Sequence, residues 1–312
     1  MVSAPRLIAL DWGSSQLRAY LLGDGGVVLA ERHSADGASR LAGGAPAFEQ
    51  ALASLVSDWW TEGGLPVLAC GMVGSAHGWR EVPYAACPVA LDSLHEQAGV
   101  VRMAGQRDVR IVPGLCWTPA DGPPDVMRGE ETQVLGLLAA QAAWAEGSTL
   151  VLPGTHSKWV SVRDGRVTSF ATHMTGELFA LLCAHSVLGR LMQPATGSDT
   201  AAFERGVHSG ASGGGAALGR WLFSVRTLGL FQALSPESLA DYLSGLLIGS
   251  ELGAALPGAA PDHPLVLAGE PVLCERYALA LGLLGRAAVL GPQAPAAAGL
   301  WRLARQAGWV GG

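Results

Sequence analysis

The feature that most constrains the fold is a pattern that occurs twice, once near the start of the chain and once near its middle. Each copy reads as an apolar strand, a polar turn with glycine, a second strand, a glycine turn, a third strand and a helix. The first copy begins with the apolar run Leu7–Leu10, and the second begins with Thr149–Leu152. Short apolar runs bounded by turn residues are typical of buried strands. The repeat predicts two α/β units of one design, which can face each other across a cleft.

The polar turn of the first copy carries one acid and two hydroxyls. Asp11 ends the first strand, and Gly13 allows a backbone conformation that residues with a Cβ resist. Ser14 and Ser15 follow the glycine. A turn that presents backbone N–H groups, hydroxyls and a carboxylate can hold a phosphate and a metal ion together. The same residues are also typical of an ordinary β-hairpin in which the acid caps its own turn.

The corresponding turn of the second copy consists of Gly154, Thr155, His156, Ser157 and Lys158. Its glycine and threonine align with the glycine and the first serine of the first turn. Lys158 is the single lysine of the chain against nineteen arginines, and this favours a functional requirement over chance. These groups can donate hydrogen bonds to phosphate oxygens, although a polar hairpin turn with a solvated histidine has the same composition.

The composition predicts a globular protein of the cytoplasm that binds small molecules. The 312 residues are 49% hydrophobic and 15% charged, which supplies a large core and argues against disorder. The net charge is −6 and no basic cluster is present, so nucleic acid is not expected as a partner. No uninterrupted apolar run reaches the length of about 18 residues that a membrane span needs. The five cysteines are far apart and form no C-x-x-C pair, which is typical of reduced thiols.

The likeliest position for a domain change by composition is the Pro- and Gly-rich connection Trp117–Asp125. We therefore expect domains at 1–125 and 126–312, and the last helix, over 296–309, is the segment that can pack back on the first domain. The second half is expected to be mostly helical. Its predicted helices include 216–230 and 236–256, preceded by a glycine-rich loop over 209–215.

Two further positions are candidates for chemistry. Glu130 and Glu131 open a predicted helix, where adjacent acids ordinarily complement the helix dipole. One of them can alternatively remove a proton from an attacking hydroxyl, and the spacing does not choose between the two. Gly269 follows a buried strand and either lets a nucleotide approach the backbone or makes a simple strand–helix turn.

Two irregular stretches, GMVGSAHGWREVPYAACP and ATHMTGE, are expected to contact a substrate, because polar loops of this kind often carry binding. Arginines near these elements can bind a carboxylate, or they are surface charges. The candidate loop residues are Met72, Ser75, Trp79, Tyr84 and His173, and the candidate arginines are Arg18, Arg80 and Arg128.

Taken together, these stretches resemble the 2-dehydro-3-deoxygalactonokinase family. The segments that carry the resemblance are LDWGSSQLRAYL, ACGMVGSAHGWREVPYAACP, VPGL, DVMRGEETQVLGLL, LPGTHSKWV, FATHMTGELFALLCAHSVLG and LAGE. DVMRGEETQ and LPGTHSKW are specific, whereas DWGSS and LAGE are shared with many kinases. The resemblance implies two ribonuclease-H-like domains of the actin and hexokinase type, with mixed sheets flanked by helices and ATP in the cleft. It also implies phosphorylation of 2-dehydro-3-deoxy-D-galactonate to its 6-phosphate in galactonate breakdown.

The resemblance implies roles for the candidate residues. Asp11 would hold Mg²⁺ beside the first phosphate turn, and the turn from Gly154 to Lys158 would be the second. Gly269 would lie in the adenosine region. Glu130 and Glu131 resemble paired acids of the related exopolyphosphatases, which suggests a base there.

The sequence departs from the family pattern at two places. Leu152 and Pro153 precede the second turn, where much of the superfamily carries an Asp. Ala76 stands where a basic residue is expected. An exopolyphosphatase-like phosphohydrolase and a non-catalytic sugar-acid sensor remain the alternative functions. A homodimer is compatible with the chain.

Overall fold

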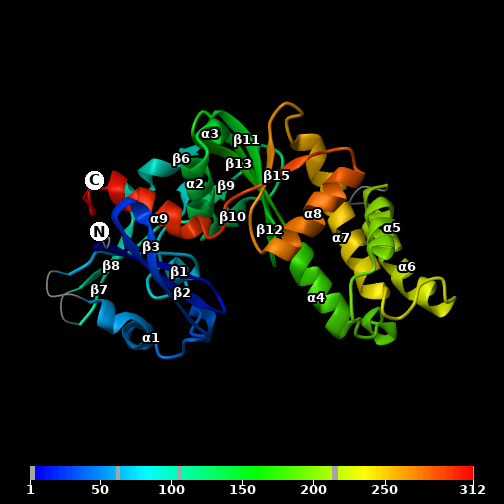
Figure 1. Ribbon diagram of the computed structural model, residues 1–312, viewed down its shortest axis with the longest axis horizontal. Helices are drawn as coiled ribbons and strands as arrows, with labels where there is room; N and C mark the ends of the chain where they lie inside the picture. The colour runs from blue at the N-terminus through cyan, green and yellow to red at the C-terminus, as the bar shows by residue number, and fades with distance from the viewer. Residues whose placement is uncertain (1–3, 61–63, 105–106, 213–216, 312) are drawn as a thin grey trace. The chain divides into compact units, whose positions relative to one another are not determined.

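A computed structural model of the protein describes residues 4–60, 64–104, 107–212 and 217–311 (Figure 1). The chain forms two compact units. The first unit consists of Met1–Gly147, Val162–Ser169 and Pro292–Gly312, and the second consists of Ser148–Ser161 and Phe170–Gly291. Each unit is therefore assembled from segments that are distant in the sequence.

The first unit is built on a six-stranded sheet of order β3-β2-β1-β4-β8-β7. The central strand β1 (Pro5–Trp12) is antiparallel to β2 (Leu17–Gly23) and parallel to β4 (Val67–Cys70). Its apolar residues are fully buried, as their run in the sequence predicts. The remaining strands are β3 (Val28–Ser34), β7 (Gly99–Arg102) and β8 (Asp108–Ile111).

The second six-stranded sheet has the order β15-β14-β11-β12-β13-β6. Read from β13 toward β15, its strands follow the order of the first sheet from β3 to β8, so the predicted repeat is confirmed at the level of topology. The mixed α/β architecture with flanking helices is confirmed as well. The strands are β6 (Val89–Ala90), β11 (Gly147–Leu152), β12 (Ser157–Arg163), β13 (Arg166–His173), β14 (Leu265–Leu267) and β15 (Ala288–Leu290).

Helices cover the sheets, and a small three-stranded sheet, β10-β9-β5, lies in the first unit. The small strands are β5 (Ala85–Ala86), β9 (Leu115–Trp117) and β10 (Asp125–Met127). The helices are α1 (Ala45–Val56), α2 (Glu130–Ala140), α3 (Ala143–Glu146), α4 (Thr175–His185), α5 (Thr200–Ala211), α6 (Leu218–Leu230), α7 (Leu239–Ala255), α8 (Pro271–Leu283) and α9 (Pro295–Gln306).

The helix α5 was not expected, and the glycine-rich loop predicted over 209–215 is wrong for its first residues, because the helix continues to Ala211. Residues 213–216 lie outside the described part of the chain. Glycines at the contact explain the difference, since they let α5 approach α7 closely. A Cβ on Gly206 would lie 2.2 Å from the carbonyl oxygen of Tyr242, and one on Gly245 would lie 2.0 Å from that of Phe203.

The two compact units do not meet at the expected boundary 125/126, because 126–147 belong to the first unit. The last helix, α9, lies with the first unit, as expected. Figure 1 shows α9, in red, beside α2. A Cβ on Gly136 of α2 would lie 1.9 Å from the carbonyl oxygen of Pro295, and one on Gly299 of α9 would lie 1.9 Å from that of Thr132. Close packing of these two helices holds both chain segments in one unit.

One helical segment of the described residues, Leu239–Gly258, is long and apolar enough to cross a membrane by length and composition. Its most apolar window has a mean hydropathy of 1.2 and is 67% buried in the structure. Such burial is typical of a core helix. Apolar residues of α7 accordingly pack into two hydrophobic clusters of the second unit.

Candidate active site

Backbone hydrogen bonds from the segment after β3 hold the first turn in place. The carbonyl oxygens of Gly13 and Ser14 accept hydrogen bonds from the backbone N–H groups of Ala38 (2.9 Å) and Ser39 (3.1 Å). The packing is tight, because a Cβ on Gly37 would lie 2.2 Å from the carbonyl carbon of Ser15. Ser14 and Ser15 themselves are exposed. The local backbone thus fixes the turn while both serines remain accessible to a ligand.

Asp11 stands beside two residues of neighbouring strands in the first unit. In the sheet register it lies opposite Cys70 of β4 and opposite Arg18 of β2. Burial raises the pKa of the Asp11 carboxyl, and the charge of Arg18 partly opposes this increase. Asp11 is therefore a half-buried carboxylate at the end of a central strand, where a cation would strongly favour its ionised form.

The three acids that the sequence singles out lie around one thiol of the first unit. Burial raises the pKa of the Cys70 thiol well above its usual value. The negative charges of Asp11, Glu131 and Glu130 raise it further, in that order of size. Asp11 and the two glutamates, which are 119 and 120 positions away from it in the chain, thus act on the same thiol, as a shared site requires.

The two glutamates bind the loop that precedes α2. Oε2 of Glu130 accepts a hydrogen bond from the N–H of Arg128 (3.1 Å), and Oε2 of Glu131 accepts one from the N–H of Gly129 (2.6 Å). Gly129 has φ +108°, a conformation that favours glycine. Both side chains therefore accept hydrogen bonds from backbone N–H groups at the start of α2. This is the role that acids ordinarily have at a helix N-terminus.

The two glutamates differ in environment. Glu131 is fully buried, and its Oε1 has no hydrogen-bond partner. Burial, with a smaller contribution from the charge of Glu130, raises the pKa of Glu131 to about 8. Glu130 is only half-buried, so a ligand can reach its carboxylate more easily.

The three candidate arginines are placed very differently. Arg18 and Arg80 are exposed, and Arg80 donates to the carbonyl oxygen of Val100. Arg128 is only 8% exposed. Its Nη2 donates to the carbonyl oxygen of Val82 (2.6 Å), and its guanidinium carbon lies 4.3 Å from the centre of the Tyr84 ring. Nε and Nη1 of Arg128 are buried and have no hydrogen-bond partner among the described residues.

The remaining candidates of the first long loop divide between surface and core. Met72 and Ser75 are half-buried, and Tyr84 is 40% exposed. Trp79 is buried, with its ring centre 5.9 Å from that of Trp12 and 5.9 Å from that of Phe48. The side chain of Trp79 therefore packs in the core of the first unit.

In the second unit, the turn after β11 is tied to the start of α4. The N–H of Glu177 donates to the carbonyl oxygen of Thr155 (2.9 Å). A Cβ on Gly176 would lie 2.3 Å from the carbonyl oxygen of Gly154. Nε2 of His156 lies 2.5 Å from Oε2 of Glu177. Thr155 and His156 are exposed. The turn thus presents accessible polar groups on a backbone that α4 holds in place.

The last two residues of this turn point into the second unit. Ser157 is fully buried, and its Oγ lies 2.8 Å from the hydroxyl of Tyr277. Lys158 is 5% exposed, and its Nζ donates to Oγ1 of Thr172 at 3.0 Å. His173, on the same strand as Thr172, is half-buried with an unpartnered Nε2. Direct phosphate contacts by Ser157 and Lys158 remain predictions.

A cavity of about 230 Å³ adjoins this turn within the second unit. Gly154 lies at its wall, and the other lining residues come from α4, α7 and α8. Most of the surface is apolar, contributed by residues such as Phe179, Leu247 and Leu273. Gly269, with φ +154°, lies beside Pro153, since a Cβ there would be 3.1 Å from the Pro153 carbonyl oxygen. Gly269 and the second turn are thus neighbours.

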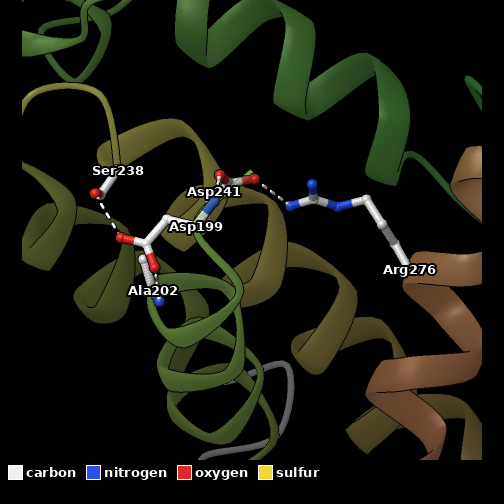
Figure 2. Close-up of polar contacts among 5 residues, drawn as sticks. All are labelled: Asp199, Ala202, Ser238, Asp241 and Arg276. Carbon is white, nitrogen blue, oxygen red and sulfur yellow. Dashed lines mark hydrogen bonds and ion pairs between the residues drawn. The ribbon is translucent and has the colours of Figure 1, made fainter. Parts of the chain in front are cut away.

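Two of the residues that line the cavity, Asp241 and Arg276, are charged, and Figure 2 shows the hydrogen bonds that hold them. Arg276 donates to Oδ1 of Asp241 (2.8 Å), and the other oxygen of Asp241 accepts from the N–H of Asp199 (2.6 Å). Asp199 caps α5 by accepting from the N–H of Ala202 (3.0 Å), and it accepts from Oγ of Ser238 (2.6 Å). The Ser238 hydrogen bond, followed by the backbone ones, lowers the pKa of Asp199. The charged pair is therefore fixed by its neighbours.

Several residues around this cavity were missed from the sequence, namely Asp241, Glu251, Arg276 and Tyr277. Glu251 offered a signal, because it is an acid in the mainly apolar second half of a predicted helix. An acid at a buried helical position is unusual unless it is paired. The other three gave no local signal.

The residues present fit a magnesium ion bound mainly by phosphate and water. No group of three or more His, Cys, Asp and Glu side chains among the described residues forms a metal site. Mg²⁺ commonly uses only one or two carboxylates together with substrate phosphates and waters. A single carboxylate such as Asp11, next to a turn that can hold phosphate, satisfies this requirement.

Comparison with known proteins identifies the family of the chain. Residues 11–303 match the family model of 2-keto-3-deoxy-galactonokinase. The 2-dehydro-3-deoxygalactonokinase of Escherichia coli K12 is 39% identical over 283 residues, which are 90% of each chain. A relative from Rhizobium meliloti assigned to the same activity is 39% identical over 284 residues, again 90% of each chain.

Solved structures support the same assignment. A crystal structure from Sinorhizobium meliloti assigned to 2-dehydro-3-deoxygalactonokinase superposes with a TM-score of 0.83 at 38% identity, covering 96% of this chain and 98% of that one. Component A of (R)-2-hydroxyglutaryl-CoA dehydratase from Acidaminococcus fermentans shares the fold, with a TM-score of 0.51 at 14% identity over 97% and 100% of the chains. The chain therefore belongs to the 2-keto-3-deoxy-galactonokinase family.

Proposed function

We propose that the protein transfers the terminal phosphoryl group of ATP to 2-dehydro-3-deoxy-D-galactonate and forms its 6-phosphate. The observation that carries the proposal is the duplicated turn, which follows the corresponding strand of each sheet in a chain of this family. Phosphoryl transfer depends on positioning and charge neutralisation more than on covalent chemistry by the protein. Two turns rich in hydroxyls and backbone N–H groups can position the phosphates and help to neutralise their charge.

The residues divide into three roles. Ser14, Ser15 and Thr155 are the accessible hydroxyls that would bind phosphate oxygens. Asp11 would hold Mg²⁺, which supplies neutralisation of phosphate charge when bound. The apolar cavity beside Gly154 would accept the nucleoside of ATP.

Glu130 is the better candidate for the catalytic base. Its carboxylate is half-buried and, together with Asp11 and Glu131, raises the pKa of the Cys70 thiol, whereas Glu131 is fully buried. A base must come within hydrogen-bond reach of the substrate hydroxyl, and accessibility favours the first glutamate. Glu131 would support the loop by binding Gly129.

Arg128 is the arginine we assign to the carboxylate of the sugar acid. Of the three candidates it alone combines burial with two nitrogen atoms that lack a partner. A buried guanidinium with unused N–H groups is costly in the unliganded protein, and a carboxylate that reached them would relieve that cost.

The proposed partners are ATP and the sugar acid, with no nucleic acid and no membrane, in the cytoplasm. The homologues are named as metabolic kinases, and this favours the kinase over the phosphohydrolase and the sensor. A homodimer remains an open alternative to a single chain.

A coupled assay of ADP formation tests the proposal. We expect turnover with 2-dehydro-3-deoxy-D-galactonate in the presence of Mg²⁺ and its loss on chelation. 2-Dehydro-3-deoxygluconate and galactonate serve as matched acceptors, and polyphosphate tests for hydrolysis. Glu130→Gln should lower kcat by roughly 10²–10⁴-fold, whereas Glu131→Gln should lower it much less. A folded protein that consumes no ATP with the first substrate would refute the kinase assignment.

A further inference from the structure

The second unit contains a buried carboxylate that the proposed chemistry does not use. Glu251, on α7, is 3% exposed. Its Oε1 accepts a hydrogen bond from the indole N–H of Trp159 (2.8 Å). Its Oε2 accepts from the hydroxyl of Tyr277 (2.7 Å) and from that of Thr175. Tyr277 in turn lies 2.8 Å from Oγ of Ser157, so five side chains form one network.

An apolar residue at position 251 would suit the helix better if stability alone mattered. Removing a carboxylate from water costs several kcal/mol, and neutral donors return only part of that cost. Among the described residues, the donors to Glu251 are an indole and two hydroxyls, all of them neutral. The rest of α7 is dominated by buried Leu, Ile and Gly, which shows that the surroundings accommodate apolar side chains.

The donors to Glu251 are attached to the elements that shape the second turn. Ser157 is the fourth residue of that turn and the first residue of β12. Thr175 begins α4 immediately before Gly176, which packs on the Gly154 carbonyl. Thr175 and Tyr277 also line the cavity of about 230 Å³. One carboxylate thus fixes the turn at its C-terminal side, the helix that supports it and the wall of the cavity.

We infer that Glu251 is a positioning residue for nucleotide binding, acting through Ser157, Thr175 and Tyr277. The inference rests on the proposed function, because it takes the second turn and the cavity as the nucleotide site. Glu251 itself touches no ligand. Its loss should weaken ATP binding and leave recognition of the sugar acid nearly unchanged.

The chemistry of the donors makes Glu251→Gln and Glu251→Met a discriminating pair. The indole N–H of Trp159 can only donate, so the amide oxygen of Gln must face it. The amide nitrogen then faces Tyr277 and Thr175, whose hydroxyls can reverse and accept. The Gln variant can therefore keep the network with some hydrogen bonds reversed, whereas Met fills the space without any hydrogen bond.

Steady-state kinetics and calorimetric titration with a non-hydrolysable ATP analogue test the inference on the full chain. For Glu251→Met we expect the KM for ATP and the analogue Kd to increase by about tenfold or more, with the KM for the sugar acid within about twofold. Glu251→Gln should restore most of the affinity. Ser224→Ala is the matched control, because Ser224 bonds Tyr242 in the same unit away from the network. It should leave nucleotide binding unchanged.

Unchanged analogue binding in a folded Glu251→Met protein would overturn the inference, as would equal effects on both substrates. If that variant fails to fold, Trp159→Phe carries the same test, because it removes one donor to Glu251 from a residue outside the lining of the cavity. The titration separates this inference from the proposed function. A wild-type protein that binds the analogue through this network without phosphorylating the sugar acid would refute only the function.

Discussion

Glu131 combines complete burial, an unpartnered oxygen and a pKa raised to about 8. The folded protein therefore favours its protonated form, while the carboxyl group of the unfolded chain titrates near its ordinary pKa of 4.5. Stability from this group is complete below about pH 4.5 and is lost as the pH rises toward 8. The buried carboxyl group is thus a source of instability at neutral and mildly alkaline pH, because the unfolded chain ionises it more readily than the folded protein does.

We expect Glu131→Gln to flatten the pH dependence of unfolding, because the amide cannot ionise. The largest difference that the shift allows is on the order of 4 kcal/mol between the two ends of the pH range. Thermal or urea unfolding of both proteins at pH 5 and pH 8.5 measures it. Parallel curves for the two proteins would show that Glu131 is ionised in the fold.

Arg128 leads to a second prediction at the same scale. Arg128→Met removes two unpartnered buried donors together with one bond to Val82, so the melting temperature should change little. The kcat/KM for the sugar acid should fall by about 100-fold or more, because charge-assisted hydrogen bonds to the carboxylate are lost. The Arg128→Met variant should turn over a substrate analogue that has an amide in place of the carboxylate nearly as well as it turns over the acid itself. A large loss of stability with intact preference for the acid would indicate a structural arginine instead.

At the scale of elements, the contact between α5 and α7 depends on glycines from both helices. Gly206 and Gly210 of α5 meet the backbone of α7, and Gly245 and Gly249 of α7 meet that of α5. Each added Cβ would lie within about 2.2 Å of a carbonyl oxygen of the other helix. The backbones therefore approach so closely that no side chain fits between them.

Gly245→Ala should accordingly destabilise the protein by roughly 1–3 kcal/mol, the usual cost of overpacking, or more if the helices separate. Gly219→Ala is the matched control, because Gly219 lies in the helix α6 with no atom within 4 Å of an added Cβ. That change should be neutral or stabilising by up to about 1 kcal/mol. Urea unfolding measures both, and equal stabilities would contradict the close contact.

The same glycines explain what sequence reasoning could and could not predict. The strands were predictable, because apolar runs and turn residues determine them locally. The helix α5 was missed since its glycines weaken helix propensity, and their purpose depends on α7, more than 30 residues further along the chain.

The candidate site shows the same division between local and distant information. The two polar turns were found from their own residues. The Glu251 network was not, because its partners Trp159 and Tyr277 are 92 and 26 positions away. The burial of Lys158 beside Thr172 could likewise not be predicted from the motif around it.

At the scale of the whole molecule, the repeat gives both units the same strand order, while their supporting elements differ. The first unit adds a small sheet, and the second adds the helical cluster of α5, α6 and α7. In the proposed function these differences correspond to a division of labour between sugar-acid recognition and nucleotide binding.

The last segment of the first unit, Pro292–Gly312, follows the second unit in the sequence. During translation, β1 and α2 leave the ribosome long before the helix α9 that packs on α2. The first unit therefore cannot complete its fold, and the surface of α2 that α9 covers stays exposed, until the intervening residues have been synthesised. The second unit, whose segments all precede α9, can complete its fold earlier. Vectorial synthesis would then reverse the order in which the two units appear in the sequence.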